Sequence, residues 1–263
     1  MNLLDHRPLG RTGLSVSRLG IASGYGAPAK AVEKAYRERG INYFFWSTPR
    51  GSGMKEALRG LVRSEREKLV IALQSYDHSG LLTARSIEKG LKAIGTDYAD
   101  VLILGWHNSV PWKRLLDTAM ELKHTGKIRF IGMSGHKRTT FGKMAQDGES
   151  PVEVYMIRYN AAHPGAESDI FPFLGNENRP GITIYTATAW RKLMKKGRMP
   201  LGEEPLSAAD CYRFVLTNPN VDLCLMGPAS DEQMDGGLSA LDRGPLSDEE
   251  MTRIRRIGAY VHG

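Results

Sequence analysis

The chain has few cysteines and no long apolar run. Only Cys211 and Cys224 occur among its 263 residues, and they form no Cys-x-x-Cys pair. We therefore expect neither a disulfide framework nor a cysteine-ligated metal site, and a reducing compartment fits best. No apolar stretch approaches the ~20 residues that cross a bilayer, and the start, MNLLDHRPLGRTG, lacks a signal-peptide core. The expectation is a soluble, cytoplasmic protein with no membrane partner.

Motifs for binding metals and nucleic acids are also missing. No His-x-His or His-Glu-x-x-His spacing occurs, so we expect no metal. The formal net charge is +7, but the basic residues are spread along the chain apart from RKLMKKGR at 191–198. Because no zinc-finger, RNP or basic-zipper pattern accompanies them, we expect no nucleic-acid partner. A small anionic ligand or a solvated basic surface explains the charge equally well.

The chain does contain short apolar runs that alternate with helical patterns. Eight runs are typical of buried parallel strands, at residues 18–23, 41–46, 69–74, 100–106, 128–134, 152–160, 181–188 and 221–227. Apolar residues recur at helical spacing or follow capping residues at 28–39, 83–94, 112–124, 207–219 and 246–261. This count and length predict an α/β protein with one (β/α)₈ barrel domain spanning residues 1–263. A doubly wound open sheet is the alternative.

Several stretches resemble an aldo-keto reductase. LGRTGLSVSRLGIASGYG (9–26) is similar to the hairpin that closes the bottom of that family's barrel, followed by its first strand. AYRERGINYFFWS (35–47), GTDYADVLILGWH (95–107) and GKIRFIGMSGH (126–136) are similar to its second, fourth and fifth strand regions. The resemblance covers nearly the whole chain and implies a barrel with the functional site at the carboxyl ends of the strands.

The resemblance also implies a carbonyl reductase that uses a tyrosine, a lysine, an aspartate and a histidine, and none of the four is present. Trp46 takes the aspartate position, Arg50 the tyrosine position after a one-residue deletion, Gln74 the lysine position and Gly105 the histidine position. Aspartate and lysine are lost together, so no unpaired buried charge remains. We expect the indole of Trp46 and the amide of Gln74 to fill that space, with Trp46 either packing there or stacking on a substrate.

The family's nicotinamide site is half retained. Gly135 and Met156 replace its asparagine and glutamine, whereas its serine and its stacking tyrosine are matched. The loop after the eighth strand, GPASDEQM, carries no basic residue, so selectivity for NADP is not supported. The resemblance implies NAD(H) or NADP(H) as cofactor, contacted by Ser134, Tyr185, Thr186, Gly227 and Ser230.

The remaining residues at the carboxyl ends of the strands form the predicted substrate site. Either histidine of the pair His107 and His136, expected to face each other across neighbouring loops, could act as acid or base near neutral pH. Arg158, like Arg50, could bind a carboxylate or phosphate. The predicted pocket comprises Trp46, Arg50, Gln74 and Trp106, and the candidate proton donors are His107, Tyr25 and Tyr76.

Three functions agree with these residues. The first is a nicotinamide-dependent oxidoreductase with a non-standard proton donor, acting on a small-molecule substrate. The second is a catalytically inactive relative that binds a small anion or a partner, as loss of all four groups would allow. The third is an isomerase or lyase that uses the histidines. The sequence specifies neither the substrate nor the oligomeric state.

Overall fold

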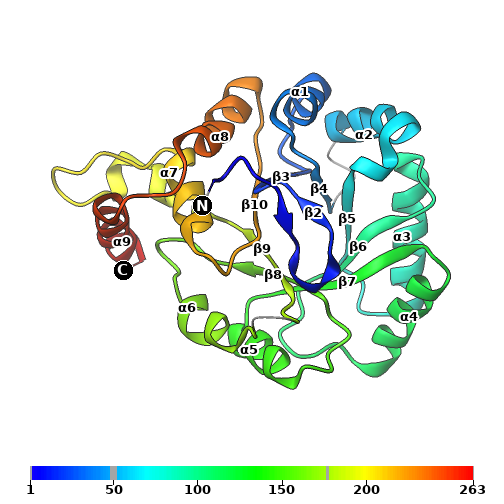
Figure 1. The fold of residues 1–263 in the computed structure, drawn as a ribbon. Helices are drawn as coiled ribbons and strands as arrows, with labels where there is room; N and C mark the ends of the chain where they lie inside the picture. The colour runs from blue at the N-terminus through cyan, green and yellow to red at the C-terminus, as the bar shows by residue number, and fades with distance from the viewer. Residues whose placement is uncertain (1, 48–51, 176–177, 263) are drawn as a thin grey trace.

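The computed structural model describes residues 2–47, 52–175 and 178–262. Eight parallel strands close into a barrel in the order β10-β3-β4-β5-β6-β7-β8-β9 (Figure 1). This closure confirms the predicted (β/α)₈ class and excludes the open sheet. The strands are β3 (Leu19–Ala22), β4 (Tyr43–Trp46), β5 (Val70–Ser75), β6 (Ala99–Leu104), β7 (Ile128–Gly135), β8 (Val154–Arg158), β9 (Gly181–Tyr185) and β10 (Leu223–Met226).

Helices surround the barrel (Figure 1). The sequence patterns do not single out α2, α5 and α8, which contain glycines that lower helix propensity. Two of these glycines permit close packing: a Cβ on Gly53 would lie 2.2 Å from the carbonyl oxygen of Ala27, and one on Gly142 equally close to that of Asp169. The α-helices are α1 (Ala29–Arg39), α2 (Ser52–Glu65), α3 (Gly80–Ile94), α4 (Lys113–His124), α5 (Arg138–Asp147), α6 (Ala166–Asp169), α7 (Ala208–Thr217), α8 (Asp231–Arg243) and α9 (Asp248–His262).

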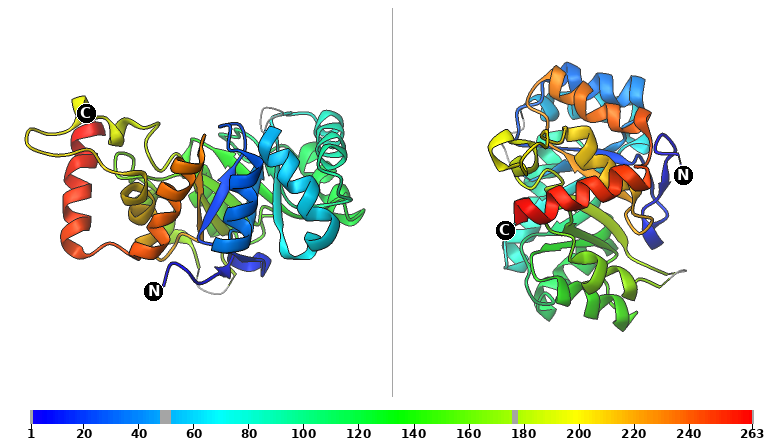
Figure 2. Two further views of the ribbon diagram at one scale, coloured as in Figure 1. Left: turned by 90° about the horizontal axis from the view of Figure 1, so that it is seen from above. Right: turned by 90° about the vertical axis from the view of Figure 1, so that its left-hand side faces the viewer.

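A short hairpin closes the amino-terminal end of the barrel, as the sequence predicts. Its strands β1 (Arg7–Pro8) and β2 (Ser15–Val16) pair antiparallel, and the hairpin lies at the lower end of the barrel in the left view of Figure 2. Leu9 and Leu14 enter the core inside the barrel. Gly10, at φ +47°, has no room for a Cβ, which would lie 2.2 Å from the amide nitrogen of Gly181. The hairpin therefore packs directly on β9.

The hydrophobic core forms two layers because side chains alternate along each strand. The inner layer fills the barrel and includes Phe45 of β4 and Ala72 of β5. The outer layer lies between strands and helices and includes Trp46, Leu73 and Leu58 of α2. Neighbouring parallel strands keep this alternation in register, with Phe45 beside Ala72 and Trp46 beside Leu73.

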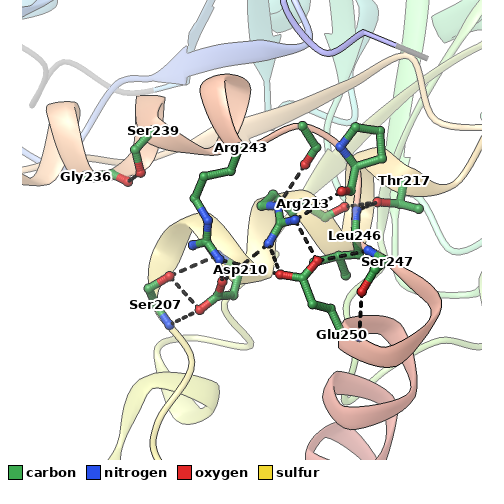
Figure 3. Close-up of polar contacts among 12 residues, drawn as sticks. Ser207, Asp210, Arg213, Thr217, Gly236, Ser239, Arg243, Leu246, Ser247 and Glu250 are labelled. Atoms are coloured by element: carbon green, nitrogen blue, oxygen red, sulfur yellow. Dashed lines mark hydrogen bonds and ion pairs between the residues drawn. The ribbon is translucent and has the colours of Figure 1, made fainter.

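A buried arginine ties together the last three helices (Figure 3). Arg213 of α7 is 4% exposed and donates two hydrogen bonds to the Glu250 carboxylate of α9, at 2.6 and 2.7 Å. It also donates to the carbonyl oxygens of Gly244 and Pro245, between α8 and α9. Arg213 holds the pKa of Glu250 down at about 2. This charged network stabilises the helices around β10.

Candidate functional site

A cavity of about 360 Å³ opens at the carboxyl ends of the barrel strands. Within the described ranges, no Asp, Glu, Lys, Arg or His side chain lines it. The residues that line this mouth cavity are small, aromatic, apolar or neutral polar: Ala22, Ser23, Gly24, Tyr25, Phe45, Ser47, Gln74, Tyr76, Trp106, Ser134, Met156, Tyr185, Thr186, Leu225, Met226 and Gly227.

Trp46 does not line the mouth cavity, which corrects the expectation that its indole fills the centre of the barrel. It is buried and belongs to the outer core layer, which also contains side chains of α1 and α2. The inward-facing residue at the end of β4 is Phe45, which lines the cavity. The place expected for Trp46 inside the barrel therefore belongs to Phe45, one residue earlier. Strict period-two alternation from Tyr43 would have found it.

Gln74 and Ser134 meet inside the mouth cavity. Gln74, which was expected to share this space with the indole of Trp46, donates a hydrogen bond from Nε2 to the Ser134 hydroxyl oxygen at 2.8 Å. The same oxygen accepts the backbone N–H of Trp106 at 3.2 Å. With two donors on its oxygen, the Ser134 hydroxyl retains its own proton for an acceptor. No such acceptor occurs among the described residues.

Three predicted aromatic residues stand at the rim of the mouth cavity. Tyr25, Tyr76 and Trp106 line it while 60%, 44% and 62% exposed. Trp106 has a left-handed backbone (φ 56°), and its ring meets Tyr76 edge-on with centroids 5.1 Å apart. Tyr25 packs on Gly227, where a Cβ would lie 2.5 Å from the phenol ring. The rim thus presents two phenol hydroxyls and one indole face to a ligand.

Tyr185 lies on the opposite wall, at the end of β9. Its hydroxyl bonds Nδ1 of His136 at 3.1 Å, and its ring lines the cavity. Burial raises the pKa of Tyr185 to about 12. The phenol also donates a hydrogen bond to the carbonyl oxygen of Gly135 at 3.4 Å. Burial, with repulsion from Arg158, lowers the pKa of His136, so the imidazole is neutral near pH 7. Thr186 follows β9 directly, and its backbone is left-handed, with φ 58°.

His107 lies outside the mouth cavity and does not face His136. Its ring stacks on His78 with centroids 4.4 Å apart and a 20° angle between planes. Its Nε2 atom is buried and has no hydrogen-bond partner in the described structure. Burial, with a smaller contribution from His78, lowers the pKa of His107 to about 4. The ring is therefore uncharged at neutral pH and cannot supply a proton there.

The other predicted residues are divided between the cavity and its surroundings. Thr186 and Gly227 line the cavity. Ser230 lies outside it and caps α8, where its hydroxyl accepts the backbone N–H of Gln233. Arg50 lies outside the described residues. Sequence reasoning missed Phe45 and Ser47, and for Phe45 the signal was the strand alternation.

The structure was also searched for metal sites and membrane spans. Within residues 2–47, 52–175 and 178–262, no group of three or more His, Cys, Asp or Glu side chains is arranged to hold a metal ion. No helix in these ranges is long and apolar enough to cross a bilayer.

Comparison with known proteins shows to which family this barrel belongs. The sequence model of the Aldo/keto reductase family matches residues 28–197, more than half of the chain. The chain belongs to the aldo-keto reductase family. L-galactose dehydrogenase of Arabidopsis thaliana is 28% identical over 308 aligned positions, which cover 98% of this chain and 95% of the relative. Since the chain has 263 residues, it lacks segments that this relative carries.

Two other comparisons agree with the family. Methylglyoxal reductase of Escherichia coli is 26% identical over 143 residues, 54% of this chain and 49% of the relative. A solved aldo-keto reductase of Bacillus halodurans, in its holo form, superposes with a TM-score of 0.78 at 20% identity, covering 96% of both chains. At that identity the structural match establishes the fold alone.

Proposed function

We propose that this aldo-keto reductase family member is a nicotinamide-dependent oxidoreductase that reduces a small carbonyl compound without the family's usual catalytic residues. The supporting observation is the mouth cavity: a hydrogen-bonded amide and hydroxyl, Gln74 and Ser134, line it together with the partly buried phenol of Tyr185 and the exposed phenols of Tyr25 and Tyr76. Its volume of about 360 Å³ is within the range of small-molecule sites, about 300–1,000 Å³. Barrel enzymes place their chemistry at this end.

The donor set of the cavity fits a nicotinamide. The Ser134 proton has no acceptor among the described residues and suits a carboxamide oxygen, while the Oε1 atom of Gln74 makes no hydrogen bond there and suits an amide N–H. The ring of Tyr185 offers an aromatic face. When bound, a reduced nicotinamide supplies a hydride. Residues 229–231 carry no positive charge, so we propose no preference for the 2′-phosphate.

The proton would come from a rim phenol. Tyr76 and Tyr25 both line the cavity, and each carries a phenol hydroxyl that can act as a general acid. Tyr76 is the better placed, because it is less exposed than Tyr25 (44% against 60%) and its ring lies beside Gly105, as the Gln74 amide does. His107 is not proposed as donor, since its pKa of about 4 leaves it unprotonated.

Titration with NADH and NADPH tests the cofactor, followed through the fluorescence of the chain, which includes exposed Trp106 on the cavity rim. We expect saturable quenching with similar affinity for both. Turnover of a panel of aldehydes and ketones tests the reaction. Tyr76→Phe should lower kcat about 10²–10⁴-fold, the usual contribution of a general acid, while leaving cofactor affinity unchanged. Tyr260→Phe, an exposed tyrosine of α9, is the control.

Two results would overturn this function. Absence of quenching at high concentrations of both dinucleotides would contradict the proposed nicotinamide cofactor. Equal kcat for Tyr76→Phe and the wild type would remove Tyr76 as donor, and Tyr25→Phe then tests the other phenol.

A small-ligand-binding module is the second candidate, favoured by one observation. No charged or imidazole side chain among the described residues lines the cavity, so the polarising groups of most carbonyl enzymes are missing. Such a module would bind ligands but turn over no member of the carbonyl panel. For either function we propose a small-molecule partner and a cytoplasmic location, where the free, buried Cys211 and Cys224 would stay reduced.

A further inference from the structure

Arg158 does not line the mouth cavity but lies beside Tyr185, which does, and it has no carboxylate partner among the described residues. It is the last residue of β8 and lies in register with Tyr185 of β9. Its guanidinium carbon is 5.8 Å from the ring centroid of Trp190. Among the described residues, no hydrogen bond or ion pair to Arg158 occurs. Arg138, by contrast, is bonded to Asp169 at 2.7 Å. A half-buried arginine held on an aromatic face keeps its donor fork available for a ligand.

His163 packs beside the same indole and is uncharged at neutral pH. Its ring meets Trp190 edge-on at 6.1 Å and the ring of His262 at 5.1 Å, and Nδ1 bonds the side-chain oxygen of Asn160 at 3.1 Å. Burial is the main cause that lowers the pKa of His163 to about 4, and repulsion from Arg158 is the next. His262, Lys192 and Arg138 add to this repulsion.

From this arrangement we propose that Arg158, held on the ring of Trp190, forms an oxyanion-binding rim, which takes the carboxylate or phosphate group of the small molecule whose carbonyl enters the mouth cavity. The assignment of that molecule as substrate rests on the proposed function; the anion site itself does not. The guanidinium fork matches a carboxylate or phosphate with two parallel hydrogen bonds. The cavity beside it is uncharged in the described structure, so the anion would be held at the rim and the neutral end inside.

Binding of anions without cofactor or turnover is the first test. Inorganic phosphate and 2-oxobutanoate are titrated by calorimetry, with the methyl ester of 2-oxobutanoate as uncharged probe. We expect saturable binding of both anions and at least tenfold weaker binding of the ester. Arg158→Gln should weaken binding of both anions at least tenfold, and Arg158→Lys less, since it keeps the charge but loses the fork. Arg114→Gln, on the exposed face of α4, is the control and should bind as the wild type does.

Equal affinities for Arg158→Gln and Arg114→Gln would overturn the site, as would equal affinity for the acid and its ester. Far-ultraviolet circular dichroism verifies that Arg158→Gln folds. If it does not fold, the anion affinities of Arg158→Lys are compared with those of Arg114→Gln instead. A second arm repeats the phosphate titration with saturating NADH. Simultaneous binding supports a substrate anion, whereas competition would assign the site to the cofactor's phosphates and overturn its assignment to a substrate. Failure of NADH to bind would remove the proposed function and leave the first arm intact.

Discussion

Replacing Ser134 by alanine tests the centre of the mouth cavity. Ser134 is 2% exposed, and its hydroxyl oxygen accepts Nε2 of Gln74 and the backbone N–H of Trp106. In Ser134→Ala both donors lose this partner. Gln74 is partly exposed and can bond water instead, so the main loss is the backbone N–H of Trp106.

These two hydrogen bonds set the size of the effect. A buried donor left without a partner costs about 1–3 kcal/mol, so we expect the free energy of unfolding to fall by about 2 kcal/mol. For a chain of this length that lowers Tm by about 4–8 °C. A nicotinamide would also lose the hydrogen bond from the hydroxyl, about 1 kcal/mol, which raises its Kd about fivefold.

Thermal denaturation and NADH titration measure the two effects separately. Ser47→Ala is the matched control, because Ser47 lines the same cavity while its hydroxyl makes no hydrogen bond among the described residues. The control should leave Tm and Kd near the wild-type values. Equal Tm for Ser134→Ala and Ser47→Ala would refute the hydrogen-bond reasoning, and equal Kd would refute contact between Ser134 and the nicotinamide.

Three further predictions concern stability. Trp46→Ala should lower the free energy of unfolding in urea by about 3–5 kcal/mol, because it leaves a cavity in the outer core layer. NADH affinity should not change, and an altered affinity would contradict the outward direction of Trp46. Arg213→Met should destabilise by about 3–5 kcal/mol, because it leaves Glu250 without its buried partner; a loss below that of an exposed substitution would contradict the network. Because burial lowers the pKa of His107 from 6.5 to about 4, the unfolded chain binds the extra proton between these values. The contribution of neutral, buried His107 to the free energy of unfolding is therefore complete above pH 6.5 and is lost as the pH falls towards 4. A nuclear magnetic resonance titration that shows His107 protonating near 6.5 would exclude this.

Much of the barrel was predictable because strand and helix periodicity are local properties. The eight runs and the closing hairpin lie where the sequence predicts them, although β8 and β9 stop earlier, at Arg158 and Tyr185. The backbone becomes left-handed at Thr186, directly after β9, and residue type alone does not reveal this change. The helices α2 and α8 were missed because their glycines lower helix propensity. In the folded chain, burial of the apolar face of each helix outweighs that propensity.

The sequence named several residues that line the mouth cavity, but not the directions of their side chains. Gln74 and Ser134 were named for separate reasons, and only the folded chain brings them within 2.8 Å. The direction of Trp46 and the stacking of His107 on His78 escaped prediction. A shift of one residue along a strand moves a side chain to the opposite face. An error of one residue therefore led us to expect Trp46 inside the barrel, where Phe45 lies.

The amino-acid sequence by itself determined the order of the barrel strands and the resemblance to the aldo-keto reductase family, since both are read from residue types and spacing along the chain. Only the tertiary structure decided which aromatic ring faces the inside of the barrel, which histidine is buried beside another, and which arginine stands at the mouth without an acid. Those outcomes depend on barrel closure, which sets side-chain direction and brings together strand ends far apart in the chain.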